Sequence, residues 1–206
     1  MKKSLLIALA FFTAGISQAQ FVRLEVEEVP NNGIVPGKTY RVYAKMQNPG
    51  DIIDAVFAEE KNPIEIKSTA KFYQHPKGGA LSNEVQRFDI QNDPKLTFDS
   101  FFTIGLTDNY NNYVTPFLMD SVQTKAFEQG NAYVSFNSAW FVTPDKRQTQ
   151  AGKDGRVLLM QLTTTGVVTG RLNLHGREKE VIDENGDVVD GGFIIEQRGL
   201  TFTCGK

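Results

Sequence analysis

The chain has 206 residues, with 22 basic and 24 acidic side chains, a formal net charge of −2 and 40% hydrophobic residues. This length can bury a sizeable core, and the mild acidity argues against a nucleic-acid-binding protein, which would usually carry a basic patch. Cys204 is the only cysteine, so no intramolecular disulfide can form and stability must come from the core. In a strand Cys204 would lie on the same face as the apolar residues Leu200 and Phe202, which favours a buried thiol.

The first 19 residues have the three-part form of a secretory signal peptide. Lys2 and Lys3 are followed by an apolar stretch at 4–16 and by small residues at Ser17 and Ala19. The apolar stretch is shorter than the roughly 20 residues that span a bilayer. We therefore expect export to the periplasm, the cell surface or the medium, with a mature chain of residues 20–206 that has no membrane span.

The N-terminal part of the mature chain alternates between apolar and polar residues, as half-buried strands do. Residues 21–29 alternate with charged side chains, and in 39–46 the side chains of Tyr40, Val42 and Ala44 share an apolar face. Two further short strands are predicted between Asn, Pro and Gly breaks, at 52–58 and 64–68.

The middle of the chain is less regular. Residues 73–92 are expected to form a long loop with at most a short strand at 85–90, whereas the alternation in 96–105 predicts a strand. The Asp- and Asn-rich residues 107–112 predict a loop, and the one short helix is expected at 121–128. A strand at 131–142 leads to Trp140, whose apolar neighbours are more typical of core packing than of a binding platform.

The C-terminal third contains the clearest strands. The near-continuous apolar run within 156–163 predicts a strand buried on both faces, and 167–174 returns after a Thr-Gly turn. Asn185-Gly186 is a strong hairpin signal between two short strands. Two more strands are predicted to close the fold, at 193–197 and 200–204.

About ten short strands, frequent turn residues and at most one short helix predict an all-β fold. Because several strands have one apolar face, an antiparallel β-sandwich is favoured over a barrel. We see no repeat and no linker, so residues 20–206 are expected to form a single domain.

Six segments together suggest a family: GKTYRVYA at 37–44, DAVF at 54–57, FYQH at 72–75, FDSFFTIG at 98–105, WFVTP at 140–144 and DGRVL at 154–158. They resemble a poorly characterised β-rich module of exported and cell-surface proteins of Bacteroidetes, often found as repeats in very large proteins. The resemblance covers nearly the whole mature chain and implies an extracellular setting with adhesion or binding. It supplies no catalytic residues, and the single copy here argues against a structural array.

The sequence gives little support to a catalytic centre. His75 and His175 are the only histidines, no nucleophile-elbow pattern is present, and both are interpreted as surface residues. A glycosidase would need two opposed carboxylates, but any chain with this many acids offers such pairs. Asp99 is the most interesting single acid, and a structural role in binding loop backbone is the simpler interpretation.

A calcium site is one possible interpretation of the C-terminal hairpin. Asp183, Asn185 and Asp187 have the alternating oxygen spacing of a Ca²⁺ loop. The later positions where such a loop requires glycine and glutamate hold Val188 and Ile194 in this chain. A plain Asn-Gly hairpin is therefore favoured over a Ca²⁺ site. The Asp- and Asn-rich loop at 107–112 is interpreted as solvated, and no cofactor is expected.

Exposed aromatic side chains are the best candidates for ligand contacts, because flat rings can stack on sugar faces. Tyr43, Tyr110 and Tyr113 are the three expected to be exposed.

The leading hypothesis is an exported, non-catalytic binding or adhesion module of the bacterial envelope, with a glycan or a surface protein as partner. One alternative is a carboxylate-dependent glycan-active enzyme, and another is a structural subunit that pairs through open strand edges. The oligomeric state stays open.

Overall fold

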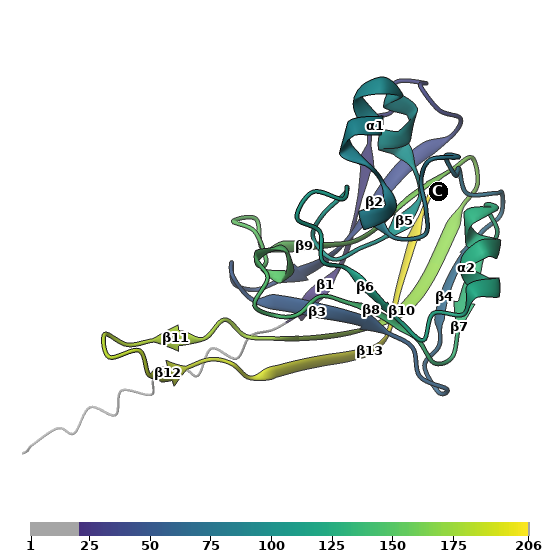
Figure 1. The fold of residues 1–206 in the computed structure, drawn as a ribbon. Coiled ribbons are helices and arrows are strands. Elements are labelled where there is room, and N and C mark those ends of the chain that lie inside the picture. The colour runs from purple at the N-terminus through teal and green to yellow at the C-terminus, as the bar shows by residue number, and fades with distance from the viewer. Residues whose placement is uncertain (1–20, 206) are drawn as a thin grey trace, which may run out of the picture.

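The computed structural model describes residues 21–205, so the predicted signal peptide lies outside the described residues. Thirteen strands in antiparallel sheets account for 43% of the structure and helices for 14% (Figure 1). The predicted all-β class is therefore confirmed. In residues 21–205 no helix has the length and apolar character needed to cross a membrane.

The first sheet is antiparallel and has four strands in the order β1-β2-β9-β5. Its core-facing side chains match the predicted alternation, since Tyr40, Val42 and Ala44 are buried. The register places Val42 opposite both Val26 of β1 and Met160 of β9. The strands are β1 (Phe21–Val29), β2 (Lys38–Met46), β5 (Phe101–Phe102) and β9 (Arg156–Thr164).

The second sheet is organised around β10 (Val168–Arg177), the strand with the most partners. Strands β3 and β4 pair with different halves of β10, while β13 pairs with it from Val168 to Arg177. The outer strands β8 and β6 extend the β3 side and β7 extends the β4 side. The bounds are β3 (Ile52–Phe57), β4 (Ile64–Ser68), β6 (Thr115–Phe117), β7 (Tyr133–Ser135), β8 (Ala139–Phe141) and β13 (Ile194–Cys204).

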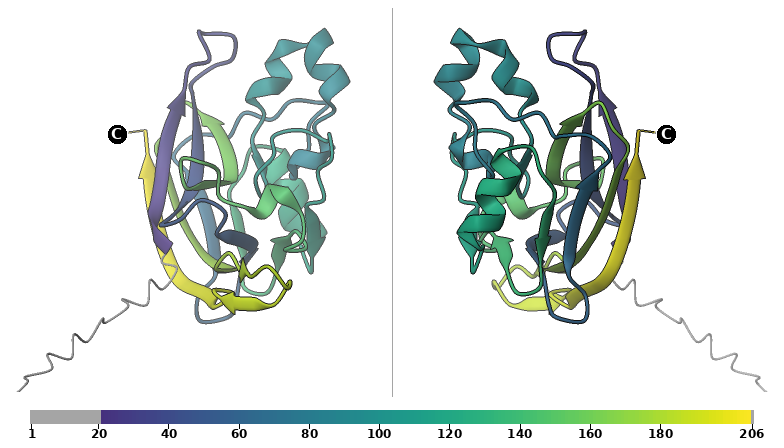
Figure 2. Two further views of the ribbon diagram at one scale, coloured as in Figure 1. Left: turned by 90° about the vertical axis from the view of Figure 1, so that its left-hand side faces the viewer. Right: turned by 90° about the vertical axis from the view of Figure 1, so that its right-hand side faces the viewer.

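The two sheets face each other as layers, and one apolar core lies between them (Figure 2). Trp140 is fully buried there, stacks on Phe102 with ring centroids 4.7 Å apart, and donates its indole N–H to the Thr103 carbonyl at 3.0 Å. Phe102 also stacks on Phe127 of α2 (Ser121–Glu128), the helix predicted at 121–128. The interpretation of Trp140 as a packing residue is confirmed.

The expected strand at 96–105 is mostly wrong, because residues 94–98 form the 3-10 helix η2 (Pro94–Phe98) and only β5 is extended. Asp93 caps this turn by accepting the Lys95 N–H, and Pro94 favours the first helical position. The segment crosses the outer face of β9, which is therefore buried on both faces as predicted. Its alternating apolar residues pack into two clusters, Leu96 and Phe101 in one and Phe102 in the main core.

Smaller departures occur at three places. The expected loop at 73–92 contains η1 (Ser82–Glu84) and the short helix α1 (Arg87–Asn92). The expected strand at 131–142 is split into β7 and β8, and the two predicted final strands are one strand, β13, which continues through Gly199 at a φ of 64°.

Beyond the ends of β10 and β13 the chain forms the two-stranded ribbon predicted around Asn185-Gly186. Its strands are β11 (Val181–Ile182) and β12 (Val188–Asp190), and it projects from the body of the sandwich (Figure 1).

Candidate functional site

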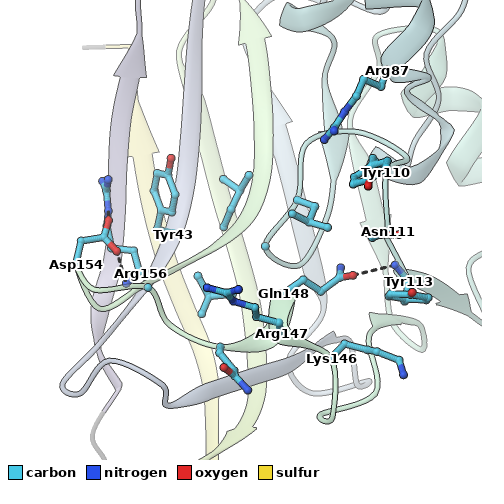
Figure 3. Close-up of a pocket in the computed structure, with 16 residues that line it drawn as sticks. Tyr43, Arg87, Tyr110, Asn111, Tyr113, Lys146, Arg147, Gln148, Asp154 and Arg156 are labelled. Carbon is cyan, nitrogen blue, oxygen red and sulfur yellow. Dashed lines mark hydrogen bonds and ion pairs between the residues drawn. The ribbon is translucent and has the colours of Figure 1, made fainter.

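A groove of about 660 Å³ opens between strands β2 and β9 on one side and the loop at 105–113 on the other (Figure 3). Tyr43, Tyr110 and Tyr113 all line this groove, so the structure brings together the three tyrosines singled out in the sequence. Tyr110 and Tyr113 are 58% and 52% exposed. Tyr43 is only partly exposed, and burial raises the pKa of its phenol.

The strand wall of the groove is built by sheet register. Tyr43 of β2 lies opposite Leu158 of β9, and Arg156, two residues earlier on β9, places its guanidinium carbon 4.3 Å from the Tyr43 ring centroid. The Arg156 Nε donates to Asp154 at 2.7 Å, and its Nη1 lies 3.0 Å from Glu27. The hydrogen bond from Arg156 lowers the pKa of Asp154, so both groups are charged at neutral pH.

The loop wall repeats the pairing of a tyrosine with a cation. The guanidinium carbon of Arg87, from α1, lies 4.3 Å from the Tyr110 ring centroid, and the same side chain forms an ion pair with Asp108 at 3.0 Å. The Lys146 ammonium lies 5.2 Å from the Tyr113 ring centroid. Each tyrosine of the groove therefore has a cation over its ring, an arrangement that is favourable in itself.

The loop wall of the groove is held in place by Gln148, in η3 (Arg147–Thr149). Its amide nitrogen donates to the Ile104 carbonyl at 2.7 Å and to the Asn112 side chain at 3.1 Å, while its amide oxygen accepts the Tyr113 N–H at 2.9 Å. The loop passes so close that a Cβ at Gly105, whose φ is 82°, would lie 1.9 Å from the Gln148 carbonyl oxygen.

The groove has an excess of positive charge. Arg87, Lys146, Arg147 and Arg156 line it against a single carboxylate, Asp154. Three of these cations have carboxylate partners, but exposed ion pairs contribute little and can be exchanged for a ligand. Arg147 forms no ion pair with any residue in the range 21–205, and its guanidinium lies between the two walls (Figure 3).

These cations and Gln148 were missed by the sequence analysis. The only local signal was the Lys146-Arg147 pair in a polar loop, and a basic dipeptide is too common to indicate a site. Arg87 and Arg156 reach the groove from segments far apart in the chain, so no spacing rule could have joined them.

Asp99 does not line the groove. It is fully buried, and its Oδ1 accepts the His75 backbone N–H at 2.7 Å, as expected for an acid that binds loop backbone. The prediction that both histidines are surface residues is wrong for His75, whose side chain is 7% exposed and bonded to Asp93 at 3.0 Å. His175 is more exposed and contacts Asp54 at 2.6 Å. Neither of these two histidine–aspartate pairs lines the groove.

The acidic turn of the ribbon uses its oxygens within the turn. Oδ1 of Asp183 accepts the backbone N–H groups of Asn185 and Asp187, at 2.8 and 3.0 Å, and these bonds lower the pKa of Asp183. This is the arrangement of an Asx turn closing a hairpin. Across residues 21–205, three or more His, Cys, Asp or Glu side chains never gather in a way that could hold a metal ion.

Comparison with known proteins found no matching family model, curated protein or solved structure. The resemblance of the sequence to a cell-surface module therefore stays a prediction.

Proposed function

We propose that this protein is an exported, non-catalytic binding module and that its groove binds an anionic polysaccharide. The observation that carries the proposal is the convergence of three tyrosines, each beneath a cation, on a groove that also holds Arg147, which has no carboxylate partner among residues 21–205. Flat aromatic faces suit pyranose rings, and guanidinium groups suit carboxylate or sulfate substituents.

The charges of the groove support binding over hydrolysis. A carboxylate-dependent glycosidase needs an acid and a second carboxylate on either side of the bond it cleaves. Asp154 is the only carboxylate lining this groove, and its pKa is lowered, the opposite of what a general acid requires. Two acids have a raised pKa, Asp99 in the protein interior and Glu178 at the base of the ribbon, and neither lines this groove.

The test compares polymers that differ only in charge. Dextran sulfate should raise the melting temperature of the mature protein, while neutral dextran should not, because a ligand at a hundredfold excess over its Kd stabilises the native state by about 2.7 kcal/mol. Polygalacturonate and its methyl ester form a second matched pair, in which the charge is a carboxylate.

Variants locate the binding. Arg147→Gln and Tyr110→Ala should each weaken binding, the tyrosine change by roughly threefold to tenfold, as expected for loss of an aromatic contact. Phe88→Ala is the matched aromatic control, since Phe88 is 74% exposed and outside the groove, and Lys61→Gln is the matched cation control. Equal binding of the charged and neutral polymers would contradict the proposal, as would equal losses in the controls.

A further inference from the structure

The ribbon at residues 178–193 carries an apolar surface that the rest of the described chain leaves uncovered. Its apolar side chains are 50–59% exposed, and Ile194, which follows it, is 73% exposed. An isolated two-stranded ribbon is marginally stable in water, and clustered exposed apolar residues mark interaction surfaces. The exposed apolar residues of the ribbon are Val181, Ile182, Val188, Val189 and Phe193.

The partner of this surface should be cationic. Residues 178–193 hold six of the 24 acidic residues and one of the 22 basic residues, so the ribbon is more acidic than the whole chain. At its base, Glu178 is 6% exposed, and its Oε1 has no hydrogen-bond partner among residues 21–205. Burial raises the pKa of Glu178, so this unpartnered oxygen belongs to the interior of the ribbon's base, and the exposed acids of the ribbon carry its charge. Two ribbons would repel each other, which argues against contact between like surfaces.

The chain itself presents a surface of the required kind. The groove described above combines four cations with exposed tyrosine rings, whereas four other hollows in the described part of the chain each hold at least as many carboxylates as lysines and arginines. The base of the ribbon lies beside the groove, because one residue lines both the hollow at that base and the groove. Glu178 and Glu180 line a hollow with Pro144, Asp145 and Gln150, and Gln150 also lines the groove.

We propose that the ribbon of one copy docks in the groove of a second copy, and that the contact is reciprocal in a two-fold dimer. A ribbon whose base lies beside the groove of its own protomer allows both contacts to form at once, and a two-fold axis is the commonest symmetry of protein dimers. The acidic turn faces the groove cations, and the apolar strands cover the tyrosine rings. The ribbon and an anionic polysaccharide then compete for one groove.

The experiment is sedimentation velocity on the mature protein without polysaccharide, over a range of concentrations. We expect a dimer in low salt that weakens in about 1 M salt, where the Debye length is about 3 Å. Glu184→Gln with Asp187→Asn removes two of the three acidic charges of the turn and keeps the Asp183 hydrogen bonds, and Arg147→Gln alters the groove. Each variant should dimerise roughly tenfold more weakly than the wild type.

Mixing the two variants gives the decisive result. In the heterodimer the unaltered ribbon of one variant meets the unaltered groove of the other, and both changes fall in the second contact. The mixture should therefore contain a heterodimer that is tighter than either variant homodimer. The matched controls, Glu60→Gln and Lys61→Gln, change exposed charges elsewhere and should dimerise like the wild type. A wild-type protein that is monomeric at all concentrations, a mixture that stays monomeric, or growth beyond a dimer would overturn the proposal.

The outcome is separable from polysaccharide binding. The turn variant keeps the groove intact, so it should bind dextran sulfate at least as well as the wild type even though it dimerises more weakly. Loss of dimerisation with retained binding supports both proposals, while a wild-type dimer that binds no polymer overturns the proposed function alone.

Discussion

Asp99 is a carboxylate enclosed on all sides, held by the backbone of a loop and close to Gly78. Burial raises its pKa to about 7, against the effect of backbone hydrogen bonds from His75, Gly79 and Ser100, which favour the charged form. Its Oδ2 has no hydrogen-bond partner within residues 21–205, and a Cβ at Gly78 would lie 1.7 Å from it. The folded protein therefore favours the protonated side chain, because burial outweighs the hydrogen bonds from the loop backbone.

This arrangement predicts a pH-dependent stability. In the unfolded chain Asp99 ionises near its ordinary pKa of 3.8, and in the folded protein near 7, so the folded state retains the proton over this range. Its contribution is fully present below pH 3.8 and is lost as the pH rises through 7. The shift corresponds to a difference on the order of 4 kcal/mol. Asp99→Asn should therefore gain stability relative to the wild type as the pH rises.

Urea denaturation across the pH range from acid to mildly alkaline measures this difference. The Asn side chain keeps an oxygen for the His75 N–H, so the variant should fold, and its free energy of unfolding should change less with pH. Glu60→Gln, at an exposed position, is the control. Equal pH slopes for Asp99→Asn and the wild type would show that Asp99 does not retain its proton in the folded state.

At the scale of elements, the shape of the groove depends on how η3 holds the loop at 105–113. Gln148→Ala removes three hydrogen bonds of 2.7–3.1 Å between these segments. Each bond contributes about 1 kcal/mol, and the freed Ile104 carbonyl and Tyr113 N–H lose their partner. We expect a lower melting temperature, faster amide hydrogen exchange in residues 105–113, and weaker polysaccharide binding.

Gln150→Ala is the matched control for this prediction. Gln150 also lines the groove, is exposed, and its side chain forms no hydrogen bond within the described range. It should leave hydrogen exchange in the loop unchanged. If exchange in Gln148→Ala matched that of Gln150→Ala, the loop would be held by its own turns and not by η3.

The strands that the sequence predicted well are those whose pattern follows the cover on their two faces. Strand β2 alternates because one face meets the core, and β9 holds a continuous apolar run at 157–160 because both of its faces are covered. Residues 94–102 alternate like a strand but form a 3-10 helix and a short strand, because their apolar side chains pack into two different clusters and not on one strand face. The tyrosines could be predicted as exposed from their polar neighbours, but their convergence depends on packing between distant segments.

At the scale of the whole molecule, one core cluster includes residues of both sheets and of α2. Val42 and Met160 belong to the first sheet, Val56 and Leu174 to the second, and Trp140 is fully buried among them. No side chain of the ribbon at 178–193 belongs to this cluster. The two sheets should therefore unfold together, because neither keeps a covered apolar face without the other.

Trp140 makes this prediction measurable, since it is the only tryptophan and its ring stacks on Phe102 of the opposite sheet. Its fluorescence reports contact between the layers, while far-UV circular dichroism reports the strands of both. The two signals should follow one urea transition with the same midpoint. The measurement is best made on the turn variant Glu184→Gln with Asp187→Asn, so that dissociation of a dimer does not mix with unfolding. A fluorescence midpoint at lower urea than the dichroism midpoint would mean that the sheets separate before either unfolds, and that each is stable alone.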